Sequence, residues 1–218
     1  MCRIEAIALE FLGRGGKKLR PRLCRAVYER CGGKGTLDAL CEAIECFHKA
    51  SLIHDDIQDG DEERYGRPTV WKEHGVPLAI AAGDWLVANG YRLICDSGFA
   101  AAREMLAAAV TSHMRLCEGQ GDDLLAMTSP NASFDAESYV SICERKTGEA
   151  FALAAQLGAL AAGADDAPFR RYGLAFGVLF QINDDLADGD APADLIALKR
   201  KYEDETAFHR DQCALGVW

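Results

Sequence analysis

The segments SLIHDDIQD (residues 51–59) and LFQINDDLAD (residues 179–188) share one pattern, D-D-x-x-D, and each follows an apolar, helix-like run. Carboxylates four residues apart lie on one face of a helix. An acidic cluster at a helix C-terminus repels itself and is also opposed by the helix macrodipole. A set made only of carboxylates suits a hard cation such as Mg²⁺, which keeps waters and bridges to substrate phosphates.

Other interpretations of the two clusters are open at this point. A single cluster could be a solvated acidic helix end, but the residues before each one, 50–53 and 174–182, are largely apolar. If the two helices face each other, their six aspartates surround one cavity that can bind several Mg²⁺ ions and, through them, a diphosphate. A metal-dependent hydrolase with His54 and Asp55 as ligands is an alternative, although the remaining histidines form no compact ligand pattern.

Apolar residues recur at spacings of three and four along the whole chain, which predicts an all-α fold. The 218 residues are enough for one domain with a full core, so we expect a single domain over residues 1–218. Residues 60–68 are expected to form a charged loop, with Thr36 and Ser133 as helix caps. The predicted helices cover residues 3–12, 18–31, 37–58, 76–97, 100–127, 135–163, 167–188 and 192–213.

The composition restricts the function and the compartment. A net charge of -10 argues against nucleic acid as a partner. The nine cysteines are odd in number and form no Cys-x-x-Cys pair, which indicates a reducing cytoplasm. No signal peptide is expected at the start of the chain, and no apolar run is long enough to span a membrane.

Basic residues occur where a bound anion would explain them. The segment GGKKLRP (residues 15–21) places cations at the start of a helix, which the macrodipole disfavours unless an anion binds there. It lacks the P-loop pattern. Arg64 follows the first aspartate cluster, and Lys146 lies in an apolar helix, where a snorkelling side chain or an ion pair is the alternative interpretation.

Taken together, the motifs GGKKLRP, HKASLIHDDIQD, GRPTVWKEHG, AIAAGDWL, ERKTG and LFQINDDLAD closely resemble those of the trans-isoprenyl diphosphate synthases, the polyprenyl synthetase family. The resemblance covers about residues 13–189 and suggests a synthase of the geranylgeranyl type. It implies an isoprenoid synthase-type helical bundle around a central cavity, here shortened at both ends, and a homodimer. It also implies that an allylic prenyl diphosphate ionises with the help of two or three Mg²⁺ ions and is attacked by isopentenyl diphosphate.

The resemblance assigns roles by motif position. Mg²⁺ would be bound by Asp55, Asp56, Asp59, Asp184, Asp185 and Asp188. The allylic diphosphate would be held by Arg64, Lys146, Thr147 and Gln181, and isopentenyl diphosphate by Lys17, Arg20 and His48. The residues expected to carry the catalytic step are Asp55, Asp56, Asp59, Lys146 and Asp184.

The residues before the first motif bear on product length. In the family, bulky residues four or five positions upstream form a floor for the growing chain, but here these positions are Ser51 and Ala50. Phe47 is a candidate for a lower floor. The resemblance therefore predicts a product longer than C15, with C20 as the single best value.

Three departures from the family pattern keep two alternatives open. Tyr65 stands where the family has a second arginine that binds isopentenyl diphosphate, and the lysine-containing loop after the second motif is missing. Lys199 and Lys201 are weak substitutes for that loop, and both ends are short. The alternatives are a non-catalytic subunit of a hetero-oligomeric prenyl synthase and a terpene cyclase of the same fold.

Overall fold

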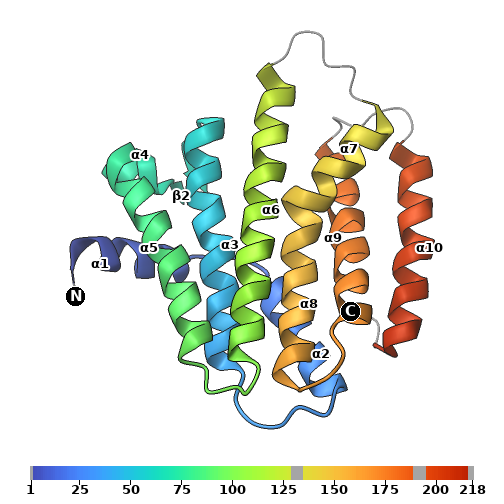
Figure 1. The fold of residues 1–218 in the computed structure, drawn as a ribbon. Coiled ribbons are helices and arrows are strands. Elements are labelled where there is room, and N and C mark those ends of the chain that lie inside the picture. Colours follow the sequence, from blue (N-terminus) through green and yellow to red (C-terminus); the bar gives the residue numbers. More distant parts are fainter. Residues whose placement is uncertain (1, 129–134, 189–194, 216–218) are drawn as a thin grey trace. The chain divides into compact units, whose positions relative to one another are not determined.

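The computed structural model describes residues 2–128, 135–188 and 195–215, and nearly all of these residues are helical, as predicted (Figure 1). Where the two can be compared, the predicted helix bounds agree with the structure to within one turn. The elements in chain order are α1 (Arg3–Leu12), α2 (Leu19–Arg30), α3 (Asp38–Asp59), β1 (Glu63–Arg64), β2 (Arg67–Pro68), α4 (Val70–His74), α5 (Val76–Cys95), α6 (Ala102–Thr128), α7 (Ala136–Cys143), a π-helical turn (Glu144–Gly148), α8 (Glu149–Ala161), α9 (Ala167–Asp188) and α10 (Leu195–Cys213).

The backbone contacts divide the chain into two compact units. Unit 1 consists of Met1–Arg22 and Thr36–Gly98, and unit 2 of Leu23–Gly35 and Phe99–Trp218. Within the described residues, no helix is long and apolar enough to cross a membrane.

Unit 1 is built on the packing of α3 against α5, with α1 and α4 also in contact with α5. Two glycines of α5 allow the close approach. A Cβ added at Gly83 would lie 2.3 Å from Nε2 of His54, and one added at Gly90 would lie 2.7 Å from the ring of Phe47. The small residues of α5 therefore set how closely α3 lies against it.

Unit 2 is centred on α8, which lies between α6 and α9 (Figure 1). Nine of its thirteen residues are buried, so this apolar helix is central to the unit. Gly173 and Gly177 bring α9 onto it: added Cβ atoms would lie 2.5 Å from the carbonyl oxygen of Phe151 and 2.7 Å from Cα of Gly148. α10 covers α9 through an apolar cluster that includes Val178, Ile182 and Leu195.

Three local predictions were wrong. Residues 60–68 are not only a loop, because β1 and β2 pair in a hairpin with Arg64 opposite Arg67. Thr36 does not cap α3, which begins after Leu37 without a side-chain cap. The predicted helix over residues 135–163 is interrupted by the π-helical turn. The start of α7 is capped by the Asp135 side chain, which accepts from the Ser138 amide. The predicted cap Ser133 lies outside the described residues.

The hairpin turns through Tyr65 and Gly66, both with positive φ (55° and 71°). Two central residues with positive φ are typical of a type I′ turn, the tight connection that best matches the twist of the flanking strands. Glycine and asparagine normally fill such positions, and an L-residue with a large side chain costs roughly 1–2 kcal/mol there. Tyr65 is therefore a strained residue at the tip of the hairpin.

Candidate functional site

The predicted site residues divide between the two units. Unit 1 contains the first aspartate motif with Arg64, Lys17, Arg20 and His48. Unit 2 contains Lys146, Thr147, Gln181 and the second aspartate motif. Each group is described by itself below.

In the first motif, the middle aspartate is turned inward. Asp56 is fully buried, and its Oδ1 accepts a hydrogen bond of 2.5 Å from Nε of Arg64, a residue of strand β1. Its Oδ2 is buried without a hydrogen-bond partner. Burial raises the pKa of Asp56, while the Arg64 guanidinium opposes that shift. A buried carboxylate oxygen without a donor is costly unless a further positive group approaches it.

The outer aspartates of the same motif differ from Asp56 in exposure. Asp55 is half-buried and Asp59 is exposed, and the two are one helical turn apart on α3. Arg64 also lies 3.6 Å from Asp61, so its charge is shared between two carboxylates. The motif thus separates into an internal ion pair, Asp56–Arg64, and an outer pair of carboxylates that can take a hard cation.

The basic residues of unit 1 are not equivalent. Lys17 is exposed on the segment before α2, whereas the guanidinium of Arg20 lies 3.3 Å from Nε2 of His48. Burial lowers the pKa of His48 to about 2, and the neighbouring cations Arg20, Lys49 and Arg64 add to that shift. Because arginine can only donate, Nε2 of the neutral His48 ring is the acceptor and Nδ1 carries the proton. Arg20 remains a cation, although burial lowers its pKa to about 10.

Two charged residues of unit 1 were missed by the sequence reasoning. Lys49 is completely buried and Glu45, one turn before it on α3, is only 6% exposed. Burial raises the pKa of Glu45, and the positive charge of Lys49 opposes that shift. A lysine directly before the apolar run ASLI was the available signal for Lys49. No signal in the sequence distinguishes Glu45 from the other acidic residues of the helix.

In the second motif the middle aspartate is again held internally. Asp185 accepts a hydrogen bond from the Tyr139 hydroxyl, and its Oδ1 accepts one of 2.8 Å from Nε2 of Gln181. Oε1 of Gln181 in turn accepts a hydrogen bond of 2.6 Å from the Thr147 hydroxyl. Burial and the contact with Asp185 raise the pKa of Tyr139, so it remains a donor. Asp184 is exposed; Asp188 ends α9, one turn further along.

Lys146 and Thr147 are presented by the π-helical turn. α6 approaches this turn closely, because a Cβ added at Gly119 would lie 2.6 Å from the backbone nitrogen of Lys146. Lys146 forms an ion pair with Asp123 of α6. π-Helical turns inside α-helices are frequent at functional sites. The contact with Asp123 confirms the ion-pair interpretation of Lys146, and the lysine side chain remains partly exposed, at 30%.

No ready-made cage for a metal exists in the part of the chain that the structure describes, where no group of three or more His, Cys, Asp or Glu side chains could hold an ion. Mg²⁺ is usually bound by one or two carboxylates together with waters and substrate phosphates. An outer pair such as Asp55 and Asp59, one helical turn apart on α3, fits that mode of binding. The donor chemistry thus suits Mg²⁺ together with a phosphate ligand.

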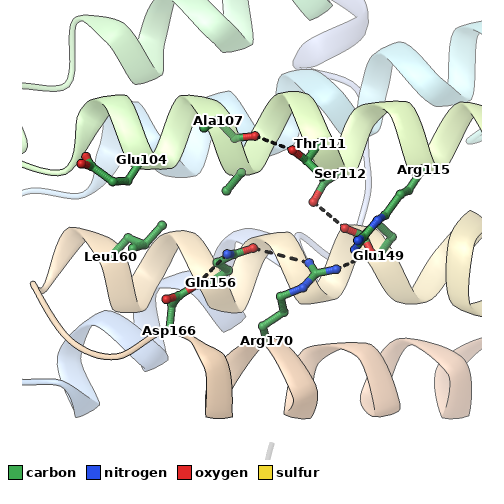
Figure 2. Close-up of a pocket in the computed structure, with 11 residues that line it drawn as sticks. Glu104, Ala107, Thr111, Ser112, Arg115, Glu149, Gln156, Leu160, Asp166 and Arg170 are labelled. Atoms are coloured by element: carbon green, nitrogen blue, oxygen red, sulfur yellow. Dashed lines mark hydrogen bonds and ion pairs between the residues drawn. The ribbon is translucent and has the colours of Figure 1, made fainter.

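A separate polar pocket of about 460 Å³ lies in unit 2 between α6, α8 and α9, and Figure 2 shows its lining. None of the predicted site residues lines it. One lining residue is Glu149, whose side chain is 3% exposed and accepts from the Ser112 hydroxyl at 2.5 Å and from Arg170 at 2.8 Å. Arg115 lies 3.6 Å away. Because these charges are paired, the network explains how a carboxylate is buried between three helices.

Comparison with known proteins finds relatives that match most of the chain. The family model for polyprenyl synthetase matches residues 2–204. The short chain isoprenyl diphosphate synthase of Methanothermobacter thermautotrophicus is 37% identical over 179 residues, which are 80% of this chain and 54% of that protein. The geranylgeranyl diphosphate synthase of Mycobacterium tuberculosis is also 37% identical over 179 residues, 80% of this chain and 51% of that protein. The chain thus spans about half the length of these two relatives.

Solved structures share the fold. An isoprenoid synthase family member from Thermotoga neapolitana superposes with a TM-score of 0.84 at 26% identity, over 97% of this chain and 84% of that one. A geranyltranstransferase from Thermotoga maritima gives a TM-score of 0.83 at 26% identity, over 97% of this chain and 82% of that one. The all-α isoprenoid synthase-type fold predicted from the sequence is confirmed.

Proposed function

The chain belongs to the polyprenyl synthetase family, and from this premise we propose that it is a Mg²⁺-dependent prenyltransferase. It condenses an allylic prenyl diphosphate with isopentenyl diphosphate to a longer trans-prenyl diphosphate. One observation carries the proposal: both D-D-x-x-D motifs end a helix with the middle aspartate held internally and the outer aspartates one turn apart. The names of the related synthases support the same reaction class.

Asp55 and Asp59 in unit 1, and Asp184 and Asp188 in unit 2, are the residues that would hold Mg²⁺. When bound, Mg²⁺ would neutralise the charge that develops on the departing diphosphate. Asp56 and Asp185 act differently from the direct role that their motif position implies. They orient Arg64 in one unit and Gln181 in the other. The family resemblance supplies the number of ions, two or three.

The cationic and polar groups beside the motifs would hold the allylic diphosphate. Arg64, Lys146, Thr147 and Gln181 supply donors to phosphate oxygens, and fixed donors stabilise the charge of a leaving group. Lys146 is paired with Asp123 and Arg64 with Asp56, so each cation is already oriented before the substrate arrives. The bond between the allylic carbon and oxygen breaks, its electrons go to the diphosphate, and the double bond of isopentenyl diphosphate forms the new carbon–carbon bond with loss of a proton.

Lys17, Arg20 and His48 would hold isopentenyl diphosphate. The neutral His48 accepts from Arg20 and so fixes the direction of its guanidinium, while Nδ1 carries the proton. Lys17 is exposed and adds a second cation on the same segment. Arg20 and Lys17 thus supply the charge, and His48 supplies orientation.

A C20 product is our proposal for chain length. Ser51 is exposed, and one turn below it the ring of Phe47 packs on Tyr91 with ring centroids 5.0 Å apart. Gly90, next to Tyr91 on α5, also lies against this ring, since a Cβ there would be 2.7 Å from it. A ring fixed in this way suits a floor for the growing chain. The name of the related geranylgeranyl diphosphate synthase points to the same length.

We further propose that the two units form one isoprenoid synthase domain and that the enzyme is a cytoplasmic homodimer. The nine cysteines are odd in number and form no Cys-x-x-Cys pair, which supports a reducing compartment. The family resemblance supports the homodimer.

The deciding experiment incubates the purified protein with Mg²⁺, farnesyl diphosphate and radiolabelled isopentenyl diphosphate, and separates the products. A longer labelled prenyl diphosphate is the expected result and gives the chain length. A hydrocarbon formed without isopentenyl diphosphate would instead indicate a terpene cyclase. An inactive protein that binds a related catalytic chain would indicate a subunit of a hetero-oligomeric synthase.

A further inference from the structure

Lys49 of α3 has no role in the proposed reaction, yet its ammonium group is completely buried. Nζ donates to the carbonyl oxygen of Arg14 at 2.5 Å and to that of Gly15 at 3.1 Å. Both carbonyls belong to the segment between α1 and α2. A buried ammonium is costly unless it is well partnered, so these two contacts tie that segment firmly to α3.

The Tyr65 ring closes the same contact from the hairpin. Nζ of Lys49 lies 4.4 Å from the ring centroid, which is a cation–π distance. Gly15 packs directly on the ring, because a Cβ added there would lie 2.9 Å from Cγ of Tyr65. Tyr65 is held in this place in spite of its positive φ of 55°. Backbone strain that the surroundings enforce is a signal of function.

The segment fixed in this way leads into the predicted site for isopentenyl diphosphate. Gly15 and Gly16 take φ values of 26° and 105°, and Lys18 a φ of 50°, so the backbone turns sharply before α2. The Arg14 side chain anchors the start of the segment by donating to Glu10 and to the carbonyl oxygen of Pro68. The path of the chain is therefore determined from Arg14 to Gly16, immediately before Lys17.

We propose that Lys49 and Tyr65 are positioning residues that clamp residues 14–16 and thereby place Lys17 and Arg20 for binding the diphosphate of isopentenyl diphosphate. The inference rests on the proposed function. It assigns Tyr65 a role through its ring face, on Lys49 and Gly15, and not through a hydroxyl contact with phosphate.

The kinetic test compares Tyr65→Leu, Tyr65→Phe and Lys49→Met in steady-state assays. Tyr65→Leu and Lys49→Met are expected to raise KM for isopentenyl diphosphate roughly 10- to 100-fold, since misplacing binding groups by about 1 Å has effects of this order. KM for the allylic diphosphate should stay within about twofold. Tyr65→Phe keeps the ring and should retain the wild-type KM. The matched control is Lys72→Met, which removes an exposed lysine that also lies over an aromatic ring, Trp71.

A rise in KM for isopentenyl diphosphate in Tyr65→Phe equal to that in Tyr65→Leu would overturn the proposal, because the hydroxyl would then be the active group. Equal rises in KM for both substrates would also overturn it, since they would reflect general loosening of the fold. Tyr65 is 43% exposed, so its variants test the clamp even if Lys49→Met does not fold.

A second measurement does not depend on catalysis. Amide hydrogen exchange of the peptide that covers residues 13–20 should be faster in Tyr65→Leu than in wild type, unchanged in Tyr65→Phe and unchanged in Lys72→Met. Unaltered exchange in Tyr65→Leu would refute the clamp. If the wild-type protein does not elongate the allylic diphosphate, the proposed function fails. The exchange result still decides whether the clamp exists.

Discussion

Asp184 and Asp185 are neighbours in the sequence, but their replacement by alanine is expected to have different consequences for stability. Asp185 accepts hydrogen bonds from Tyr139 and Gln181. Each hydrogen bond to a charged acceptor contributes about 1.5–3 kcal/mol, and the partial burial of the site favours the lower end. Asp185→Ala should therefore lose about 3 kcal/mol of unfolding free energy. Asp184 is exposed, so Asp184→Ala should change stability by less than about 0.5 kcal/mol.

The activities should follow a different order from the stabilities. Asp184→Ala removes a proposed Mg²⁺ ligand and should lower kcat at least about 100-fold, since replacing even the groups that orient a metal ligand typically costs 10- to 100-fold. Unfolding midpoints in urea, followed by far-UV circular dichroism, measure the stability. With a slope of about 2–3 kcal/mol per molar urea, the loss for Asp185→Ala corresponds to a midpoint lowered by about 1 M.

The matched control is Asn183→Ala, which truncates an exposed, uncharged polar side chain of the same helix to alanine and should leave the midpoint and kcat close to wild type. The reasoning would be refuted if Asp184→Ala unfolded at lower urea than Asp185→Ala. It would equally be refuted if Asp185→Ala were as stable as wild type, because Asp185 would then not act as an internal acceptor.

Three further outcomes are expected. Arg170→Met leaves the buried Glu149 without its 2.8 Å partner and should lower the free energy of unfolding in urea by about 3 kcal/mol. The double variant Glu149→Gln/Arg170→Met should lose clearly less than the sum of the losses in the two single variants, and additive losses would contradict this. Phe47→Ala should lengthen the products resolved by chromatography, and an unchanged length distribution would exclude Phe47 as the floor. Burial lowers the pKa of His48 to about 2, so the histidine takes up a proton on unfolding below about pH 6.5, and the protein loses stability as the pH falls. Between pH 7 and 5, this protonation should lower the free energy of unfolding by about 2 kcal/mol. His48→Gln should remove that loss from urea midpoints measured at both pH values, and an equally steep fall in the variant would argue against it.

The helices were predictable because their signals are local. Apolar spacing and glycine breaks set the bounds of α1 and α9, which match the prediction residue for residue. The π-helical turn was not predictable, because it depends on the packing of Gly119 of α6 against the backbone of Lys146. The hairpin was missed because Tyr65 occupies a position of a type I′ turn where local preference favours glycine or asparagine.

For the candidate site, too, the local features could be predicted and the tertiary contacts could not. The aspartate motifs and their attendant cations could be named from residue type and spacing, because both are local in the chain. Their unequal surroundings could not, since Asp56 and Asp185 bond to Arg64 and Tyr139, partners that other segments of the chain supply. Lys49 was overlooked because its carbonyl partners lie about 35 positions earlier in the sequence.

The sequence by itself determined the helical class, the approximate bounds of the helices, and the chemistry of the two carboxylate motifs, because periodicity and residue type act over a few residues. Tertiary structure alone decided that Asp56 accepts a hydrogen bond from Arg64 and that Asp185 accepts one from Tyr139, whereas Asp184 is exposed. It also decided that Tyr65 meets a buried lysine and a glycine segment. These outcomes depend on burial and on contacts between residues distant in the chain, and no local pattern encodes them.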